Sequence, residues 1–182
     1  MTASKERLWR SPLPLLLIII TMLASACAKQ PMPGSQPSEI GPFSQFSARL
    51  IVIEPKHRWQ VMLQWHADSA DKGEARLTHA ATGTVIELRW SGDQMQVRST
   101  ETRIWKSIGP AQLGNQGIVI PPQQLAAILL GEMPSHFKPK KQGLWESRDS
   151  GSPIRLQWTE SLQKLTMTDI KHGRQATMLI QP

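Results

Sequence analysis

The sequence predicts a mainly β domain built around one curved antiparallel sheet. Two observations predict this fold. Apolar and polar side chains alternate along several segments after residue 45, which is typical of strands with one face buried and the other in water. Turn-forming sequences separate these segments at spacings of about 8 to 12 residues, as in an antiparallel meander. These turns have the sequences EPKH, DSADKG, ATG, SGD, DSGS and KHG.

The clearest strand is WQVMLQW, residues 59–65, in which Trp59, Val61, Leu63 and Trp65 share one face. Five other segments alternate in the same way, which predicts further strands of the same sheet. Their expected inward-facing residues are Phe46, Ala48, Leu50 and Val52; Ile86, Leu88 and Trp90; Met95 and Val97; Ile154, Leu156 and Trp158; and Leu165 and Met167.

One segment, IPPQQLAAILLGEMP, has a helical pattern instead. Two prolines suit a helix start, Leu125, Ile128 and Leu129 recur at helical spacing, and Gly131 marks the stop. The sequence therefore predicts a short apolar helix at residues 122–130. A second segment, residues 102–109, fits either a helical turn or a strand.

The first 26 residues have the pattern of an export signal. Lys5, Arg7 and Arg10 form a basic region, residues 13–23 form an apolar region, and small residues precede Cys27. The apolar run is shorter than the roughly 20 residues that a membrane-spanning helix needs. We therefore expect this segment to direct export and to be removed.

Cys27 is the only cysteine of the chain, so a disulfide within the chain is impossible. Its setting resembles the lipobox of bacterial lipoproteins, which implies that Cys27 becomes the acylated first residue of the mature protein. The alternative is an ordinary signal peptide that leaves Cys27 as a free thiol. Because Ala28 and Lys29 follow, without the aspartate that commonly retains lipoproteins at the inner membrane, we expect a lipid anchor in the outer membrane, on the periplasmic side.

The chain is thus expected to have three parts: a lipoprotein signal peptide at residues 1–26, an acylated cysteine and flexible tether at residues 27–45, and a β domain at residues 46–182. Proline, serine, glycine and glutamine predominate in the tether. Without residues 1–26, which contain Lys5, Glu6, Arg7 and Arg10, the net charge falls from +7 to about +5, and it favours an anionic neighbour such as a lipid headgroup surface or an acidic peptide. The basic residues form neither a basic helix nor an arginine–aromatic alternation, so nucleic acid is not an expected partner.

Motifs for catalysis or metal binding are missing from the sequence. The five histidines lack HxH or HExxH spacing, the serines lie outside GxSxG and SxxK patterns, and no glycine-rich phosphate loop is present. Asp68 and Asp71 lie in a turn sequence, where carboxylates are usually solvated. We expect neither enzymatic activity nor a cofactor nor a metal.

Large apolar side chains are the most distinctive feature, because the chain has seven tryptophans and eight methionines but no tyrosine. Trp59, Trp65, Trp90 and Trp158 all fall on inward-facing positions. Two interpretations stay open at this stage. The sheet either packs a filled core or curves around an apolar cavity that accepts acyl chains.

A family resemblance bears on this choice. The segments FSARLIVIE, WQVMLQW, EARLTHAATGTVIELRW, GIVIPPQQLAAILLGEMP, IRLQW and LTMTDI are similar, in this order, to the LolB-like outer-membrane lipoprotein receptors of the LolA/LolB superfamily. IPPQQLAAILLGEMP is the most specific of them, and Arg49 and Leu50 with Trp65 in the next strand add to it. The resemblance covers residues 46 to about 171. It implies an incomplete barrel, with one or two short helices over an apolar cavity for the acyl chains of lipoproteins delivered through the periplasm.

The alternation and the resemblance together give a set of candidate cavity residues. They are Leu50, Val52, Trp59, Val61, Leu63, Trp65, Ile86, Leu88, Trp90, Leu125, Ile128, Leu129 and Trp158. Thr82 and Gly83 occupy the place of a family loop that carries a protruding apolar residue, usually leucine before glycine, so the chain departs from the family there.

Two functions follow as expectations. The first is an outer-membrane lipoprotein that binds acyl chains of lipoproteins or lipids and assists their localisation, with a periplasmic lipoprotein carrier as a further partner. The second is a lipid-anchored structural or assembly protein that uses the same scaffold, with a filled core, to dock a protein partner.

Overall fold

The computed structural model describes residues 36–37, 39–109, 112–113, 118–147 and 153–181. Cys27 and the predicted signal peptide lie outside the described residues. The strands and helices have the following bounds: β1 Gln36–Pro37, β2 Gln45–Ile53, β3 Arg58–Ser69, β4 Lys72–His79, β5 Val85–Ser91, β6 Gln94–Ser99, β7 Lys106–Ser107, α3 Pro122–Leu129, β8 Glu132–Met133, β9 Phe137–Lys141, β10 Leu144–Ser147, β11 Ile154–Thr159, the 3-10 helix η1 Glu160–Leu162, β12 Lys164–Asp169 and β13 Arg174–Gln181.

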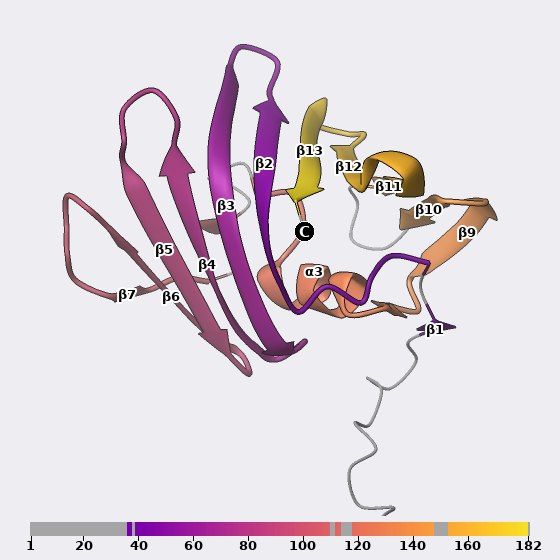
Figure 1. Cartoon of the computed structure of the whole chain (residues 1–182), viewed down its shortest axis with the longest axis horizontal. Helices are drawn as coiled ribbons and strands as arrows, with labels where there is room; N and C mark the ends of the chain where they lie inside the picture. The colour runs from indigo at the N-terminus through magenta and orange to yellow at the C-terminus, as the bar shows by residue number, and fades with distance from the viewer. Residues whose placement is uncertain (1–35, 38, 110–111, 114–117, 148–152, 182) are drawn as a thin grey trace, which may run out of the picture. The chain divides into compact units, whose positions relative to one another are not determined.

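One antiparallel sheet of 11 strands forms the body of the fold, in the order β7-β6-β5-β4-β3-β2-β13-β12-β11-β10-β9. It consists of two runs of consecutive antiparallel strands, which meet where β13 pairs with β2. The sheet curves but does not close, so β7 and β9 are its edges (Figure 1). The fold class predicted from the sequence, a mainly β protein with a curved antiparallel sheet and a short helix, is confirmed.

The two faces of the sheet differ as the alternation predicts. In β3, Val61, Leu63 and Trp65 are buried, whereas Met62 and Gln64 between them are exposed. Register carries this difference from strand to strand, because Trp65 pairs with Phe46 of β2 on one side and with Ala75 of β4 on the other. We call the face with the buried side chains the inner face and the opposite one the outer face.

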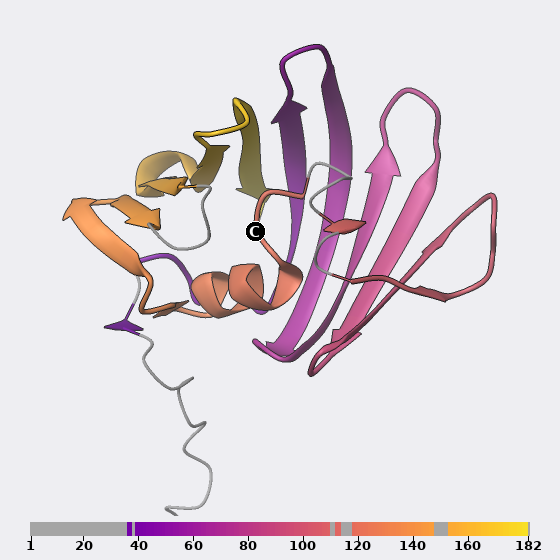
Figure 2. The ribbon, with the colours of Figure 1, turned by 180° about the vertical axis from the view of Figure 1, so that it is seen from behind.

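The helix α3 and the chain before it cover part of the inner face (Figures 1 and 2). Pro121 is the N-cap residue and Pro122 the first helical residue, as predicted. The helix ends at Leu129, and Gly131 follows with φ of 93°, a conformation that favours glycine. No helix among the described residues is long and apolar enough to cross a membrane.

The expected tether, residues 27–45, is wrong for its last part. Ile40 is completely buried, and the ring of Phe43 lies 5.8 Å from that of Trp158. Gly41 makes this packing possible, since a Cβ atom built there would lie 2.1 Å from the carbonyl oxygen of Leu129. Gly41 therefore serves a close approach here rather than a flexible linker, and the described fold already includes β1 at Gln36–Pro37.

The core extends from Ile40 to Ile180. A chain that begins at Ala28 therefore contains every residue of the core, and this chain is the one suited to experiments in solution. Two smaller differences concern strand bounds. Lys72 and Gly73 belong to β4 rather than to a turn, and the ambiguous segment 102–109 contains the two-residue strand β7.

Candidate functional site

An apolar cavity lies between the inner face and α3. Its volume is about 100 Å³. Residues from the sheet, from α3 and from the chain before α3 line it: Leu50, Val52, Trp59, Leu63, Trp65, Ala75, Leu77, Leu88, Ile118, Val119, Ile120, Pro122, Leu125, Met167, Ala176 and Met178. The lining contains no charged side chain and is almost entirely apolar, so the cavity suits an apolar occupant.

A wider groove of about 700 Å³ lies beside this cavity. Its apolar part is formed by Trp59, Val61, Leu77, Ile86, Val97 and Ile118. Its edge is formed by polar residues at the ends of β4 and β6 and in the turns that follow them. Trp59, Leu77 and Ile118 line both the groove and the cavity. The two hollows therefore adjoin along a shared apolar wall.

The two volumes differ in what they can hold. Sites for small ligands are usually about 300 to 1,000 Å³, so the groove falls in this range and the cavity falls below it. Ile118 lines both hollows, whereas Leu125, Met167 and Met178 line the cavity and not the groove. A long apolar chain would thus lie mainly in the groove, and it would reach further only if residues 118–125 moved away from the sheet.

The predicted cavity residues separate into three groups. Leu50, Val52, Leu63, Trp65, Leu88 and Leu125 line the cavity, Val61 and Ile86 line the groove, and Trp59 lines both. Trp90, Ile128, Leu129 and Trp158 line neither hollow and are buried in the core.

Sequence reasoning missed several lining residues. Leu77 and Ala75 alternate within EARLTH, a signal that was present in β4. The apolar run Ile118, Val119 and Ile120 directly precedes the two prolines, and it contributes to the cover of the cavity. An apolar run outside any strand or helix pattern gives no indication of which face it packs on.

The turn at Thr82 and Gly83 is polar and internally bonded. The Thr82 backbone N–H donates to Nδ1 of His79 at 3.2 Å, and the Thr82 hydroxyl donates to that of Thr84 at 2.9 Å. Thr82 and Thr84 line the groove at its edge. Thr82, at the position where the LolB-like family has a protruding apolar residue, is thus part of a hydrogen-bonded polar edge of the groove.

The buried tryptophans differ in whether their indole N–H groups have a hydrogen-bond acceptor. The indole N–H of Trp90 donates to the carbonyl oxygen of Ala70 at 3.0 Å. Within the described residues, the indole N–H of Trp65 has no acceptor, although Trp65 is buried and lines the cavity. An unpaired buried donor costs about 1 to 3 kcal/mol.

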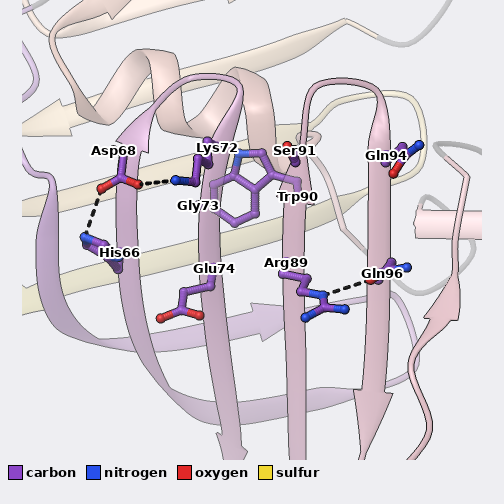
Figure 3. Close-up of a pocket in the computed structure, with 10 residues that line it drawn as sticks. All are labelled: His66, Asp68, Lys72, Gly73, Glu74, Arg89, Trp90, Ser91, Gln94 and Gln96. Atoms are coloured by element: carbon purple, nitrogen blue, oxygen red, sulfur yellow. Dashed lines mark hydrogen bonds and ion pairs between the residues drawn. The ribbon is translucent and has the colours of Figure 1, made fainter.

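A polar pocket of about 360 Å³ lies beside β3–β6 (Figure 3). In Figure 3, Asp68 lies between His66 and Lys72, at 3.4 and 3.3 Å. All three side chains are about half exposed or more, so these ion pairs are solvated and weak. Among the described residues, no group of three metal-ligating side chains is close enough to hold an ion.

A second hollow on the outer face, of about 780 Å³, contains Trp105 with Glu87 and Arg98. The guanidinium groups of Arg89 and Arg98 lie 4.2 and 4.7 Å from the centre of the Trp105 ring. Arg98 also donates a hydrogen bond to Glu87, and this bond lowers the pKa of the Glu87 carboxyl below its ordinary value. The arrangement fixes Trp105 against the outer face.

The chain was compared with protein families, with curated proteins and with solved structures. No protein-family model matches the chain, and no curated protein does. Among solved structures, the chain is similar to the crystal structure of a LolA superfamily protein from Nitrosomonas europaea, with 9% identity and a TM-score of 0.42, over 76% of this chain and 83% of that chain. The fold and site described here rest on the strand order, the register and the lining residues of this chain.

Proposed function

We propose that the domain binds an acyl chain of a lipoprotein or lipid, along the groove and into the adjoining cavity. The observation that carries this proposal is the apolar wall shared by the two hollows, formed by Trp59, Leu77 and Ile118. An acyl chain has no polar group along its length, so it matches a wall that offers no charged partner. Each CH₂ group buried there would contribute about 0.8 kcal/mol to the affinity.

The proposal includes the place where binding occurs. Cys27, once acylated, would attach the domain to the outer membrane on its periplasmic side, where it would receive the acyl chains of lipoproteins and assist their localisation. Two or more acyl chains hold a protein firmly at a membrane, whereas one chain binds only marginally. Labelling of growing cells with a palmitate analogue tests this part. Label on the wild-type protein and none on Cys27→Ala is expected, and label that persists on the variant contradicts it.

Binding of a fluorescent fatty acid by residues 28–182 tests the groove. Ile86 lines the groove with 42% of its surface exposed, so Ile86→Glu should place a charge in the groove and leave the fold intact. Met62 has a similar exposure, 37%, but lies on the outer face, which makes Met62→Glu the matched control. We expect Ile86→Glu to weaken binding at least tenfold, since a carboxylate beside an acyl chain loses its hydration. We expect Met62→Glu to bind as the wild type does.

The alternative function is that of a lipid-anchored structural or assembly protein that docks a protein partner. The small volume of the cavity, about 100 Å³, favours this alternative, because it leaves the core almost filled. It predicts that the wild-type domain is folded and monomeric but binds no acyl ligand. If the wild type and Ile86→Glu bind the fatty acid equally well, the ligand binds elsewhere and the groove is not the binding site.

A further inference from the structure

Four turns lie at one end of the sheet, and we call them the rim: residues 54–57, 80–84, 100–105 and 170–173. Strand pairing places them together. Ile53 at the end of β2 pairs with both Arg58 of β3 and Gln175 of β13, and the backbone N–H of Thr100 donates to the carbonyl oxygen of Val85. In Figure 1 these turns follow the ends of β2, β4, β6 and β12.

Three isoleucines at the rim face solvent. Ile104 is 66% exposed, Ile170 is 44% exposed and Ile53, at the strand end beside the first turn, is 39% exposed. A single exposed isoleucine is ordinary on a protein surface. Three of them, in or directly beside three separate turns at the same end of a sheet, form a repeated feature of that end.

The rim is also basic. Lys56, Arg103 and Lys171 lie in these turns, and Arg58 and Lys106 directly follow two of them. All five are exposed, and within the described part of the chain none of them is ion-paired with a carboxylate. Glu54 and Glu101 are the acidic residues of these turns. Asp169, directly before the last turn, is paired with His172. The rim therefore has an excess of positive charge.

At the opposite end of the sheet, acidic and basic residues nearly balance. Its turns and its 3-10 helix carry Asp68, Asp71, Asp93 and Glu160. The same end carries Lys72, which is paired with Asp68 at 3.3 Å, together with Lys141 and Lys164. The charge of the chain is thus distributed unevenly between the two ends, and only the basic end carries the three exposed isoleucines.

We propose that the rim binds the surface of a lipid bilayer with anionic headgroups, with the isoleucines entering the interface and the basic residues contacting the headgroups. Apolar side chains flanked by lysine and arginine have this distribution in proteins that lie at membrane surfaces. Nucleic acid or an acidic protein would engage the charges but offers no apolar layer for isolated isoleucines. The inference concerns side chains other than those of the groove wall, so it stands whether or not the groove binds an acyl chain.

This placement has a geometric consequence for the groove. Thr82, Thr84, Thr102 and Lys106, all from the rim or directly beside it, line the groove. A bilayer bound at the rim would therefore lie at the mouth of the groove.

The first experiment uses residues 28–182, which contain no cysteine, so a single introduced thiol can carry an environment-sensitive fluorophore. Ile104→Cys places the label at the rim. Leu162→Cys is the matched control, because Leu162 is 59% exposed in the 3-10 helix at the opposite end. With vesicles of mixed anionic and zwitterionic lipid, the label at residue 104 should shift to the blue and the label at residue 162 should not. An absent shift at residue 104, or an equal shift at both, overturns the proposal.

The second experiment measures vesicle partitioning of unlabelled variants. Lys56→Gln and Arg103→Gln should each weaken partitioning about fivefold, and wild-type binding should weaken as salt is raised. Ile104→Ser should weaken it about tenfold. Lys141→Gln, an exposed lysine beside the turn at the opposite end, serves as the control and should bind normally. Equal effects of rim and control variants overturn the proposal, as does tighter binding to poly-glutamate or DNA that Ile104→Ser leaves unchanged.

Discussion

The two halves of the sheet obey the same alternation but end in different states. Along β11, β12 and β13, the inward-facing Leu156, Leu165 and Met178 are fully buried. Along β3–β6, Trp59, Leu77 and Val97 face the same side but stay half-buried, and they line the groove. Alternation thus determines which face of a strand turns inward, and it does not determine whether that face is filled.

What covers each half accounts for the difference. The segment 39–43 packs between α3 and β11, where Phe43 contacts Trp158 and its N–H donates to the carbonyl oxygen of Leu129. Over β3–β5 the described part of the cover includes residues 118–125, and the groove lies open near the rim. The groove lies in the half that residues 39–43 do not cover.

The largest expected effect comes from a charge placed in the deep part of the open half. Leu88 is buried beside Trp65 and lines the cavity, so Leu88→Glu should lower the free energy of unfolding by about 4 kcal/mol or more, because the carboxylate would be unpaired. Urea denaturation measures this change. Ile86→Glu, two residues away in the same strand, should cost less than about 1 kcal/mol. A folded Leu88→Glu protein of normal stability would show that the cavity admits water.

The next effect concerns the cover itself. Gly41 has φ of 94°, and an added Cβ would lie 2.1 Å from the Leu129 carbonyl oxygen, so Gly41→Ala should destabilise the domain by about 3 to 5 kcal/mol. Gly131 has nearly the same φ, 93°, with no atom within 4 Å of an added Cβ. Gly131→Ala should therefore cost only the backbone strain, about 1 to 2 kcal/mol. Equal melting temperatures for the two variants would argue against the tight packing of residues 39–43.

Matched leucine truncations compare the two halves directly. Leu156→Ala should cost about 3 kcal/mol, because the side chain is completely buried and leaves a cavity. Leu77→Ala should cost about 1 kcal/mol, since Leu77 already borders two hollows. Both values come from chemical denaturation, and a reversed order would remove the distinction between a packed and an open half.

The smallest effect depends on pH. The hydrogen bond from Arg98 holds the pKa of Glu87 below its ordinary value, so the ionised pair stabilises the fold above the unfolded-state pKa, and this contribution is lost as pH falls through the lower folded-state pKa. Because the pair is partly exposed, Glu87→Gln should cost only about 0.5 kcal/mol at pH 7. The difference between the two proteins should shrink in acid. A difference that grows as pH falls would exclude this pair as its cause.

Much of the sheet was predictable, because strands that pair on both sides and face a core show period-two alternation. The strands β9 and β10 were not expected from the sequence. β9 is an edge strand containing Pro139 and three lysines, and an edge position tolerates both. β13 was overlooked although Ala176, Met178 and Ile180 alternate in it. Its place between β2 and β12 depends on pairing between distant segments, which no local pattern specifies.

The candidate site was predictable in part for the same reason. Strand residues such as Leu63 and Leu88 were assigned to the inner face by their phase, and they line the cavity. Trp90 and Trp158 have the same phase but lie in the core, since the distinction depends on what packs against them. The burial of Ile40 and the cover formed by residues 118–120 follow from tertiary contacts alone.

The N-terminal segment contacts the cover before it reaches the sheet. β1 pairs with β8, directly after α3, and Phe43 bonds to the last residue of α3 before β2 begins at Gln45. A pulling force applied to the N-terminus would therefore act first on these contacts, and only afterwards on the long ladder between β2 and β3. In a chain held by its N-terminus, mechanical tension and the opening of the inner face would be coupled through the same few hydrogen bonds.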